Sequence, residues 1–382
     1  MMKKFRVVSA TLLSAILICA ICVSAGAAMT GTGTEADPYK LSSQADLALL
    51  SGANYAGYVG QNVYFELAND ISMSGAFTPI GTSTYKFNGK FDGRNHVITG
   101  LTTTDNTING QALFSHATAG ASIKNIVFEG ASIKGKERVA VLLGTGTGAS
   151  VSNPVIIDNV IVRNSIVDAS GYNVGSIAGY GAEGGAIVIS NCKVIKSTTK
   201  SSGDGVGSIA GVGAYNGNAQ ISNCLVDSCQ TRSTSGGYVG SIAGYGAVDG
   251  NAFLSVTDCT ARNCIVQTSG AVGSIAGVGA YYGNARAEFV RCHAENCYVQ
   301  GGSHVGGIAG YGTYGAATVT CQFTDCTVEK CTVRATGNFA GGIYGSYRAN
   351  GAQPIVSGCD VLDSSILASS NAGGVTGGYC AS

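Results

Sequence analysis

Charged side chains are scarce in this sequence, and no sign of charge predominates. Asp, Glu, Lys and Arg make up 12% of the 382 residues, and their formal charges sum to zero. So small a charged fraction excludes a disordered acidic or basic chain, and the balanced charge gives no excess of Lys and Arg for binding nucleic acid. The 58 glycines follow no every-third-residue period, which excludes a collagen-like chain.

Familiar catalytic motifs are also missing. The sequence contains no His-Glu-x-x-His, no Gly-Lys-Ser/Thr phosphate loop and no Gly-x-Ser-x-Gly elbow in a supporting context. The four histidines are scattered over different repeats and surroundings: His96, His116, His293 and His304. We therefore expect no catalytic residues, no metal site and no cofactor.

One long hydrophobic run is present, at the N-terminus. Lys3, Lys4 and Arg6 precede an uncharged apolar stretch over residues 7–23, and residues 25–27 read Ala-Gly-Ala. This pattern predicts a signal peptide over residues 1–27, with an uncleaved membrane anchor as the alternative. No later segment approaches 18 uncharged apolar residues. We expect an exported protein, extracellular or at the cell surface, that does not span the membrane after cleavage.

A hexapeptide returns along the C-terminal two-thirds of the chain. Its first clear copy, residues 174–179, reads Val-Gly-Ser-Ile-Ala-Gly, and a weaker forerunner occupies residues 139–144. Successive copies begin 32–35 residues apart, at Val139, Val174, Val206, Val239, Val272, Val305, Ala340 and Ala372. Residues 206–219 and 272–285 differ at one position, where Asn216 is matched by Tyr282. The pattern indicates tandem repeats that arose by duplication of a two-turn unit of about 66 residues.

Further segments of each repeat alternate from one residue to the next, as in residues 222–226 and 258–261. This period predicts strands, and Gly-Asn pairs between them mark tight turns. Three short strands in 33 residues cannot each bury their own face, so they form a core only by stacking identical rungs. We predict an all-β fold, a right-handed parallel β-helix (β-solenoid) of about ten rungs. A β-propeller is the alternative, whereas glycine interrupts every candidate helix of an ankyrin-like repeat.

The N-terminal third is less regular but compatible with this fold. Residues 41–50 place serines before an apolar pattern with helical spacing, which predicts a short helix that caps the first rung. We expect four segments in all: the signal peptide over residues 1–27, an N-terminal cap over 28–62, irregular first rungs over 63–138 and regular repeats over 139–382.

Three motifs together resemble a known family. They are residues 31–41 followed by Ala-Asp-Leu at 45–47, the element from Phe77 to Ile98 that contains Phe91-Asp-Gly-x-x-His96-x-Ile98, and the hexapeptide series. Over nearly all of the chain beyond residue 27, the sequence resembles GLUG-motif repeat proteins of bacterial and archaeal surfaces. The resemblance implies a parallel β-helix, export and an adhesin-like role, and it supplies no catalytic residues. The density of cysteine departs from the family pattern.

Twelve cysteines follow residue 27, and ten of them fall into two columns of the repeat. The first column holds Cys192, Cys224, Cys259, Cys292, Cys326 and Cys359; the second holds Cys229, Cys264, Cys297 and Cys331. We interpret them as small inward-facing structural residues stacked from rung to rung. Vertical disulfides are the main alternative, because rungs about 4.8 Å apart lie within disulfide Cα range. Metal binding is less favoured, since no paired Cys-x2-Cys or His-x3-His spacing accompanies them.

Carboxylates decide whether the chain is an enzyme, because β-helix lyases and glycosidases need two or three of them on neighbouring rungs. The strongest candidate cluster comprises Asp258, Glu295, Asp325 and Glu329. We interpret these side chains as solvated turn residues, with a polysaccharide-active lyase or glycosidase as the alternative.

Tyrosines give the more suggestive pattern. Three follow the last glycine of the hexapeptide directly, and three lie four residues after it; they are Tyr180, Tyr245 and Tyr311, and Tyr215, Tyr281 and Tyr314. Aromatic edges stacked along a solenoid form a ladder suited to ligand binding, whereas the alternative is that the rings merely cover a glycine-rich corner.

The leading hypothesis is an exported, non-catalytic binding or structural protein, adhesin-like, whose tyrosine-lined corner contacts glycans, matrix proteins or cell-surface proteins. The alternatives are the polysaccharide-active enzyme and a self-assembling surface-layer or filament component. Self-association is expected through the C-terminal rung, which has no obvious cap in the sequence.

Overall fold

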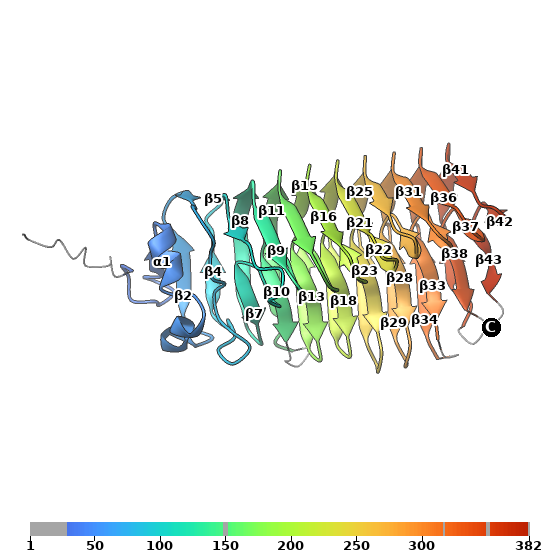
Figure 1. Cartoon of the computed structure of the whole chain (residues 1–382). Coiled ribbons are helices and arrows are strands. Elements are labelled where there is room, and N and C mark those ends of the chain that lie inside the picture. Colours follow the sequence, from blue (N-terminus) through green and yellow to red (C-terminus); the bar gives the residue numbers. More distant parts are fainter. Residues whose placement is uncertain (1–28, 148–151, 316–317, 349–351, 381–382) are drawn as a thin grey trace, which may run out of the picture.

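The computed structural model describes residues 29–147, 152–315, 318–348 and 352–380. Over these residues the chain winds into a rod of stacked β turns, and the sequence runs steadily from one end of the rod to the other (Figure 1). The predicted signal peptide, residues 1–27, lies outside the described residues.

Four parallel sheets run along the rod. The first sheet has 19 strands and contributes two strands to each regular turn. Its members are β1 (Tyr39–Leu41), β2 (Tyr64–Leu67), β3 (Ile71–Ser72), β4 (Lys90–Asp92), β5 (Val97–Thr99), β8 (Ser122–Glu129), β11 (Val155–Arg163), β14 (Ala186–Ser190), β15 (Lys193–Ile195), β19 (Asn218–Ser222), β20 (Leu225–Asp227), β24 (Phe253–Thr257), β25 (Thr260–Arg262), β29 (Arg286–Val290), β30 (His293–Glu295), β34 (Thr320–Thr324), β35 (Thr327–Glu329), β39 (Ile355–Ser357) and β40 (Asp360–Leu362).

The second and third sheets have nine strands each, and the fourth has six strands that begin at Val206. The second sheet contains β7 (Phe114–Ala117), β10 (Leu143–Thr147), β13 (Ala178–Glu183), β18 (Ala210–Tyr215), β23 (Ala243–Val248), β28 (Ala276–Tyr281), β33 (Ala309–Tyr314), β38 (Tyr344–Arg348) and β43 (Thr376–Cys380). The third contains β6 (Thr102–Thr103), β9 (Ser132–Gly135), β12 (Ile166–Ala169), β16 (Thr198–Ser201), β21 (Gln230–Ser233), β26 (Ile265–Gln267), β31 (Tyr298–Gly301), β36 (Thr332–Ala335) and β41 (Ser365–Leu367). The fourth contains β17 (Val206–Gly207), β22 (Tyr238–Gly240), β27 (Ala271–Gly273), β32 (Val305–Gly306), β37 (Phe339–Gly341) and β42 (Asn371–Gly373).

The fold is therefore an all-β parallel solenoid, as the sequence predicts, and the propeller alternative is excluded. Its size is about eight turns, since the nine strands of the second sheet are separated by eight steps along the rod. The predicted count of about ten rungs is not confirmed. The difference arises in residues 63–113, where the strands are short and join only some of the sheets, as β3 and β6 do with two residues each.

The hexapeptide sets the register from turn to turn. Its first residue pairs with the first residue of the next copy at every step, from Val139 and Val174 through to Ala340 and Ala372. The last residue is glycine because the backbone of the preceding turn passes very close. A Cβ on Gly277 would lie 2.3 Å from the amide nitrogen of Val239. Only glycine fits so close an approach of two backbones.

Two left-handed residues in each regular turn bend the chain at the first sheet. In one turn they are Asn159 and Asn164, with φ of 51° and 50°. Asparagine tolerates this conformation better than most side chains, and its amide bonds to the neighbouring turn. Asn159 Nδ2 donates to Asn125 Oδ1 at 2.9 Å, for example. Alternating strands and left-handed corners therefore explain the spacing of asparagine along the repeat.

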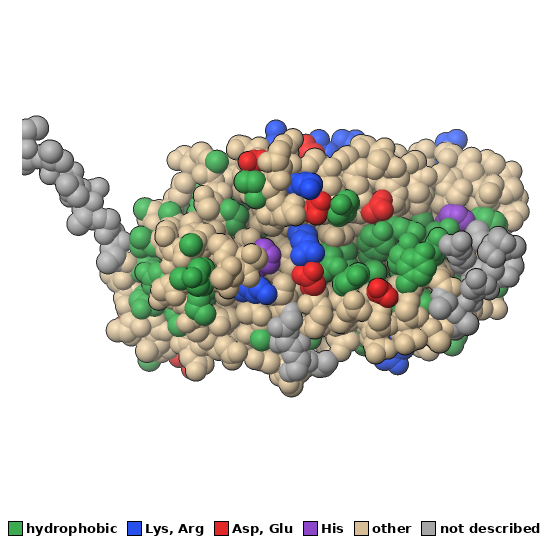
Figure 2. Space-filling model, turned by 60° about the horizontal axis from the view of Figure 1, so that its bottom comes forward, with side chains coloured by type: hydrophobic (Ala, Val, Ile, Leu, Met, Phe, Trp, Pro, Cys, Tyr) green, Lys and Arg blue, Asp and Glu red, His purple; other side chains and the backbone are tan. Residues whose placement is uncertain are grey.

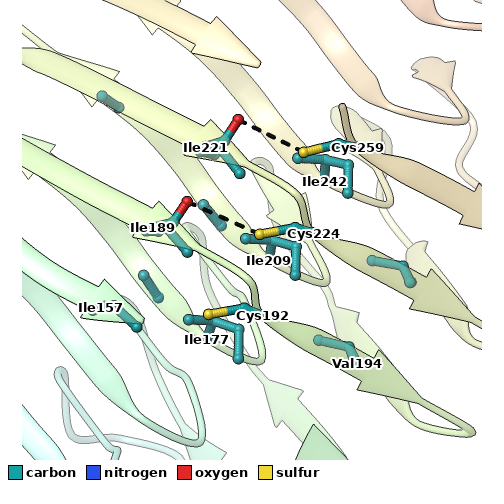
Figure 3. Packing of buried hydrophobic residues seen from close by; sticks show 14 of the residues in the cluster. Ile157, Ile177, Ile189, Cys192, Val194, Ile209, Ile221, Cys224, Ile242 and Cys259 are labelled. Carbon is teal, nitrogen blue, oxygen red and sulfur yellow. Dashed lines mark hydrogen bonds between the residues drawn. The ribbon is translucent and has the colours of Figure 1, made fainter. Parts of the chain in front are cut away.

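The core of the regular turns is filled by small and branched side chains in columns. Figure 3 shows Ile177, Ile209 and Ile242 stacked beside Cys192, Cys224 and Cys259, all of them fully or almost fully buried. Each such residue meets its own copy one turn away, so no large side chain is needed to fill the interior.

The predicted short helix is present at the N-terminal end of the rod, coloured blue in Figure 1. Helix α1 (Gln44–Ala48) begins after Ser43, whose hydroxyl accepts a hydrogen bond from the Asp46 amide at 3.2 Å. A 3-10 helix, η1 (Ala53–Tyr58), follows, and Leu47, Leu50 and Tyr55 are fully buried. The helix thus packs its apolar side into the first turn.

Candidate functional site: a tyrosine-lined face

The second sheet arranges the predicted tyrosines in two columns. In the middle column, residues on successive strands are register partners; they are His116, Thr145, Tyr180, Val212, Tyr245, Val278, Tyr311 and Ser346. The edge column lies three residues further along each strand and contains Glu183, Tyr215, Val248, Tyr281 and Tyr314. Tyr180, Tyr245 and Tyr311 therefore share one column, and Tyr215, Tyr281 and Tyr314 share the other.

A third column borders these two. It consists of the residue directly before each hexapeptide copy, and we call it the leading column. Its members are Arg138, Asn173, Gly205, Tyr238, Ala271, His304, Phe339 and Asn371.

Tyr180 and Tyr215 form a separate pair, which we call the closed pair. Their ring centroids lie 5.9 Å apart. Arg138 covers the Tyr180 ring with its guanidinium carbon 4.7 Å from the ring centroid, and it donates two hydrogen bonds of 3.0 Å to the Glu183 carboxylate. Burial, and then the charge of Glu183, raises the pKa of Tyr180. Tyr180 is only 5% exposed, so this pair offers little aromatic surface to a ligand.

Five further tyrosines form a continuous group over three turns, the open cluster: Tyr238, Tyr245, Tyr281, Tyr311 and Tyr314. Tyr281 stacks on Tyr314 with centroids 4.8 Å apart and planes 14° from parallel. Tyr238 lies 4.7 Å from Tyr245 and 5.3 Å from Tyr281, and Tyr311 lies 5.0 Å from Tyr314. Figure 2 shows a continuous hydrophobic patch over the C-terminal half of this face. All members except Tyr311 are partly exposed.

The leading column contributes to the difference between the closed pair and the open cluster. The leading-column residue one turn before Tyr180 is Arg138, whereas the residues one turn before Tyr245 and Tyr311 are Gly205 and Ala271. A Cβ on Gly205 would lie 2.9 Å from the Tyr245 ring. Arg138 therefore covers the Tyr180 ring, whereas Gly205 leaves the Tyr245 ring partly exposed. Tyr311 is 9% exposed although Ala271 is small, with His304 stacked on its ring.

Sequence reasoning identified four of the five rings of the open cluster and missed several neighbours. Tyr238, His304 and Phe339 belong to the leading column. Tyr282 is 43% exposed, and its ring centroid lies 4.3 Å from that of Tyr281. A signal for Tyr282 was available, because it is the one residue that distinguishes 272–285 from 206–219.

A groove of about 310 Å³ borders the open cluster. Asp204, Ser269, Ser303 and His304 supply its polar side chains. His304 stacks on Tyr311 with centroids 4.2 Å apart, its Nδ1 lies 2.7 Å from Ser346 Oγ, and burial lowers its pKa to about 4. Burial also raises the pKa of Tyr238, which lines the groove. At neutral pH the groove therefore presents uncharged hydroxyl and imidazole groups together with one carboxylate.

The two cysteine columns lie inside the rod, directly after its left-handed corners. The eleven cysteines whose side chains the structure describes are free thiols, and all but Cys359 are buried. Cys229 shows the usual bonding: its Sγ lies 3.2 Å from the Asp227 carbonyl oxygen and 3.3 Å from that of Val194, in the preceding turn. Burial raises the pKa of the Cys229 thiol to about 12. Ser197 extends this column, and the Cys229 Sγ accepts its amide hydrogen bond.

The candidate carboxylates divide between two different columns. Asp258 accepts two hydrogen bonds from Arg291, at 2.7 and 2.8 Å, and hydrogen bonding to this guanidinium lowers the pKa of Asp258. Asp325 follows Arg291 in the same corner column. Glu295 and Glu329 are register partners on β30 and β35. Within the described ranges, no three His, Cys, Asp or Glu side chains are grouped as metal ligands would be.

Among the residues that the structure describes, no helix has the length and apolar character needed to cross a membrane.

The fold and the tyrosine-lined face define a parallel β-solenoid with an aromatic surface ladder. No protein-family model matches the chain. It is 28% identical over 135 residues to "Halomucin" of Haloquadratum walsbyi. The matched region covers 32% of this chain and 1% of the relative. It is 29% identical over 140 residues to a "Putative Gly-rich membrane protein" of Evansella cellulosilytica, covering 35% of this chain and 15% of the relative. The chain thus spans a small part of the length of both relatives.

Two solved structures align with most of the chain. One is described as a "putative immunoglobulin A1 protease" from Bacteroides ovatus, with a TM-score of 0.49 and 16% identity over 87% of this chain and 86% of the other. The second is the A-module of a mannuronan C-5 epimerase from Azotobacter vinelandii, with a TM-score of 0.24 and 12% identity over 93% of this chain and 97% of the other. Similarities at this level carry no argument about activity.

Proposed function

We propose that this protein is an exported, non-catalytic β-solenoid of the cell surface or its surroundings, and that the open cluster is its binding face. The observation that carries the proposal is the continuous group of partly exposed tyrosines over three turns. Aromatic rings with hydroxyl groups bind ligands through both apolar contact and hydrogen bonds, and they are enriched at energetically important contacts. Extracellular glycans are the first expected ligands, and matrix or cell-surface proteins the second.

The predicted signal peptide and the resemblance to GLUG-motif surface proteins support the location. The names of the two relatives, a halomucin and a Gly-rich membrane protein, are compatible with it. We further infer that the coil is right-handed, because crossovers between parallel strands are overwhelmingly so. Helices α1 and η1 would then act as the N-terminal cap, a role supported by the complete burial of Leu47 and Tyr55.

A glycan array and a panel of matrix proteins test the binding face on the chain from residue 28 to 382. Tyr281→Ala with Tyr314→Ala removes the stacked rings, and Tyr172→Ala is the matched control, since Tyr172 is exposed but lies outside the open cluster. We expect binding that the double variant loses and the control retains. Each bound polysaccharide is also assayed for cleavage. Cleavage would overturn the non-catalytic proposal, and binding unaffected by the double variant would overturn the site.

Self-association is a second candidate function, favoured by the last turn of the rod. Strands β39 to β43 expose apolar side chains to solvent, with exposed fractions of 45–58% at Ile355, Leu362, Leu367 and Val375. Exposed apolar side chains beside sheet edges favour pairing with another copy. Light scattering over a wide concentration range, with Leu362→Lys/Leu367→Lys as the comparison, tests this. A strict monomer at every concentration would contradict it.

A further inference from the structure

The aromatic residues of the middle column recur with a two-turn step. Tyr180, Tyr245 and Tyr311 alternate with Val212 and Val278, and all five are consecutive register partners. Stacked strands lie about 4.8 Å apart, so equivalent rings are separated by roughly 9.6 Å along the rod. The surface therefore repeats in one direction, parallel to the axis of the solenoid.

The edge column keeps this step only in part, because Tyr215 and Tyr281 are two turns apart whereas Tyr281 and Tyr314 are register partners on neighbouring turns. Each middle-column tyrosine has an edge-column partner within 6 Å, since ring centroids lie 5.9 Å apart for Tyr180 and Tyr215, 5.5 Å for Tyr245 and Tyr281, and 5.0 Å for Tyr311 and Tyr314. Arg138 covers the first of these pairs, whereas Tyr245, Tyr281 and Tyr314 of the other two are partly exposed, and Tyr281 contacts Tyr314. Tyr311 is 9% exposed, with His304 stacked on its ring. A ligand on the open cluster thus meets two aromatic pairs in succession: Tyr245 with the edge ring of the next turn, and Tyr311 with the edge ring of its own turn.

The charge of the groove restricts the ligand further. Of the residues that line it, Asp204 alone is charged at neutral pH, because burial keeps His304 neutral. Asp204 also hydrogen-bonds the Tyr245 side chain. The lining contains no Lys or Arg that would neutralise an acidic polymer. Hydroxyl groups of a neutral ligand have acceptors in Asp204, Ser269 and Ser303, and a polyanion would be repelled by the carboxylate.

We propose that the open cluster binds a neutral linear glycan that lies parallel to the rod axis, with its sugar rings on successive tyrosine pairs. This inference rests on the proposed function and specifies its ligand class. A chain that contacts both open pairs binds more tightly than a fragment that reaches only one, because the second contact is intramolecular. A folded protein partner would have no such dependence on length.

Length series of defined oligosaccharides test the proposal by calorimetry on the full mature chain. The probes are neutral β-1,4-linked glucose, mannose and N-acetylglucosamine oligomers, with oligogalacturonates and alginate oligomers as acidic counterparts. We expect affinity for at least one neutral series to rise about tenfold as the oligomer becomes long enough to reach both open pairs, and then to level off. We expect weaker binding of the acidic series.

One variant reproduces the closed pair within the open cluster. Ala271→Arg introduces a long basic side chain one turn before Tyr311, as Arg138 stands one turn before Tyr180. It should abolish the increase in affinity with oligosaccharide length and leave the affinity for short oligomers within about twofold of wild type. The control, Asn173→Arg, is the same change in the leading column, one turn before Val212, and should retain the gain.

The outcomes separate this inference from the proposed function. Equal affinity for short and long oligomers, or preference for the acidic series, would overturn the inference while glycan binding stood. Binding of a matrix protein but of no oligosaccharide, lost on Tyr281→Ala with Tyr314→Ala, would overturn the inference and leave the binding face. Failure to bind any glycan or protein would overturn both.

Discussion

The closed pair and the open cluster occupy equivalent positions of the same repeat, yet one is covered and the other accessible. Tyr180 and Tyr245 have identical hexapeptides before them, and both belong to the middle column. Their neighbours in the leading column differ. The residue one turn earlier is Arg138 in one case and Gly205 in the other, and the residue of the same turn is Asn173 or Tyr238. In a solenoid, therefore, access to a side chain is decided by the neighbouring turn as much as by the turn that carries the side chain.

The largest effect is expected from two separate double variants, one that removes tyrosines of the open cluster and one that removes the closed pair. Tyr245→Ala with Tyr281→Ala should weaken binding of the ligand found in the screens at least tenfold, because truncating central aromatic contacts costs about 2 kcal/mol or more. Tyr180→Ala with Tyr215→Ala should leave affinity within about twofold. Calorimetric titration measures both, with thermal melts to confirm folding. Equal losses in the two double variants would remove the distinction between closed and open regions.

Acid sensitivity should trace in part to the open cluster. Burial lowers the pKa of His304 to about 4, below its ordinary value of 6.5, so the unfolded chain binds a proton that the folded chain excludes. Stability is therefore lost as the pH falls from about 6.5 to about 4. His304→Asn, which accepts the left-handed backbone, should reduce that loss by on the order of 1–2 kcal/mol.

Urea unfolding at pH 7 and at pH 4.5 measures this difference. His116→Asn is measured beside His304→Asn, since burial also lowers the pKa of His116, in the middle column, to about 4. A loss of stability on acidification that is the same in wild type and His304→Asn would contradict the prediction.

A smaller effect should follow from Tyr282→Asn, which restores the residue found at the equivalent Asn216. Tyr282 has its ring 4.3 Å from Tyr281 and 5.5 Å from Tyr314 at the rim of the open cluster. We expect binding to weaken about threefold to fivefold, because rim contacts contribute less than central ones. The reciprocal change, Asn216→Tyr beside the closed pair, should have no effect on affinity. A gain of affinity in Tyr282→Asn would show that this ring obstructs the ligand.

The smallest effect is expected from opening the closed pair. Arg138 has a φ of 59°, so Arg138→Gly suits the backbone while it uncovers Tyr180. The loss of an exposed ion pair and of one cation–π contact should cost about 1 kcal/mol of stability. Affinity for long oligomers should rise by about twofold as a third pair becomes accessible. Unchanged exposure of Tyr180, measured by its chemical modification, would contradict this explanation of the closed pair.

Much of the fold could be predicted from residues that act within one repeat. The first residue of each hexapeptide, Val174 for instance, gave the register because every copy occupies the same place in its turn. The start of α1 was predictable from serines before an apolar pattern. The rung count was too high, because strands such as β3 and β6 are too short to complete a turn of regular sheets.

The site was predicted less completely, for a physical reason. The six tyrosines could be assigned to two columns by their spacing from glycine. Whether a ring is covered depends on leading-column residues outside the hexapeptide, such as Arg138 over Tyr180 and His304 on Tyr311. Tyr238 and His304 join the cluster from the leading column, whose closeness to the other two columns follows only from how the corner bends.

The register of the middle column also means that adding an even number of turns to the rod differs in effect from adding an odd number. Aromatic and aliphatic side chains alternate there from turn to turn, as Tyr245, Val278 and Tyr311 do. A chain that gains turns in pairs keeps the alternation in phase over its whole length. A chain that gains or loses a single turn brings two like residues together and divides the surface into two sections of opposite phase. Growth by unequal recombination can therefore lengthen this rod freely, but it extends the continuous face only in even steps.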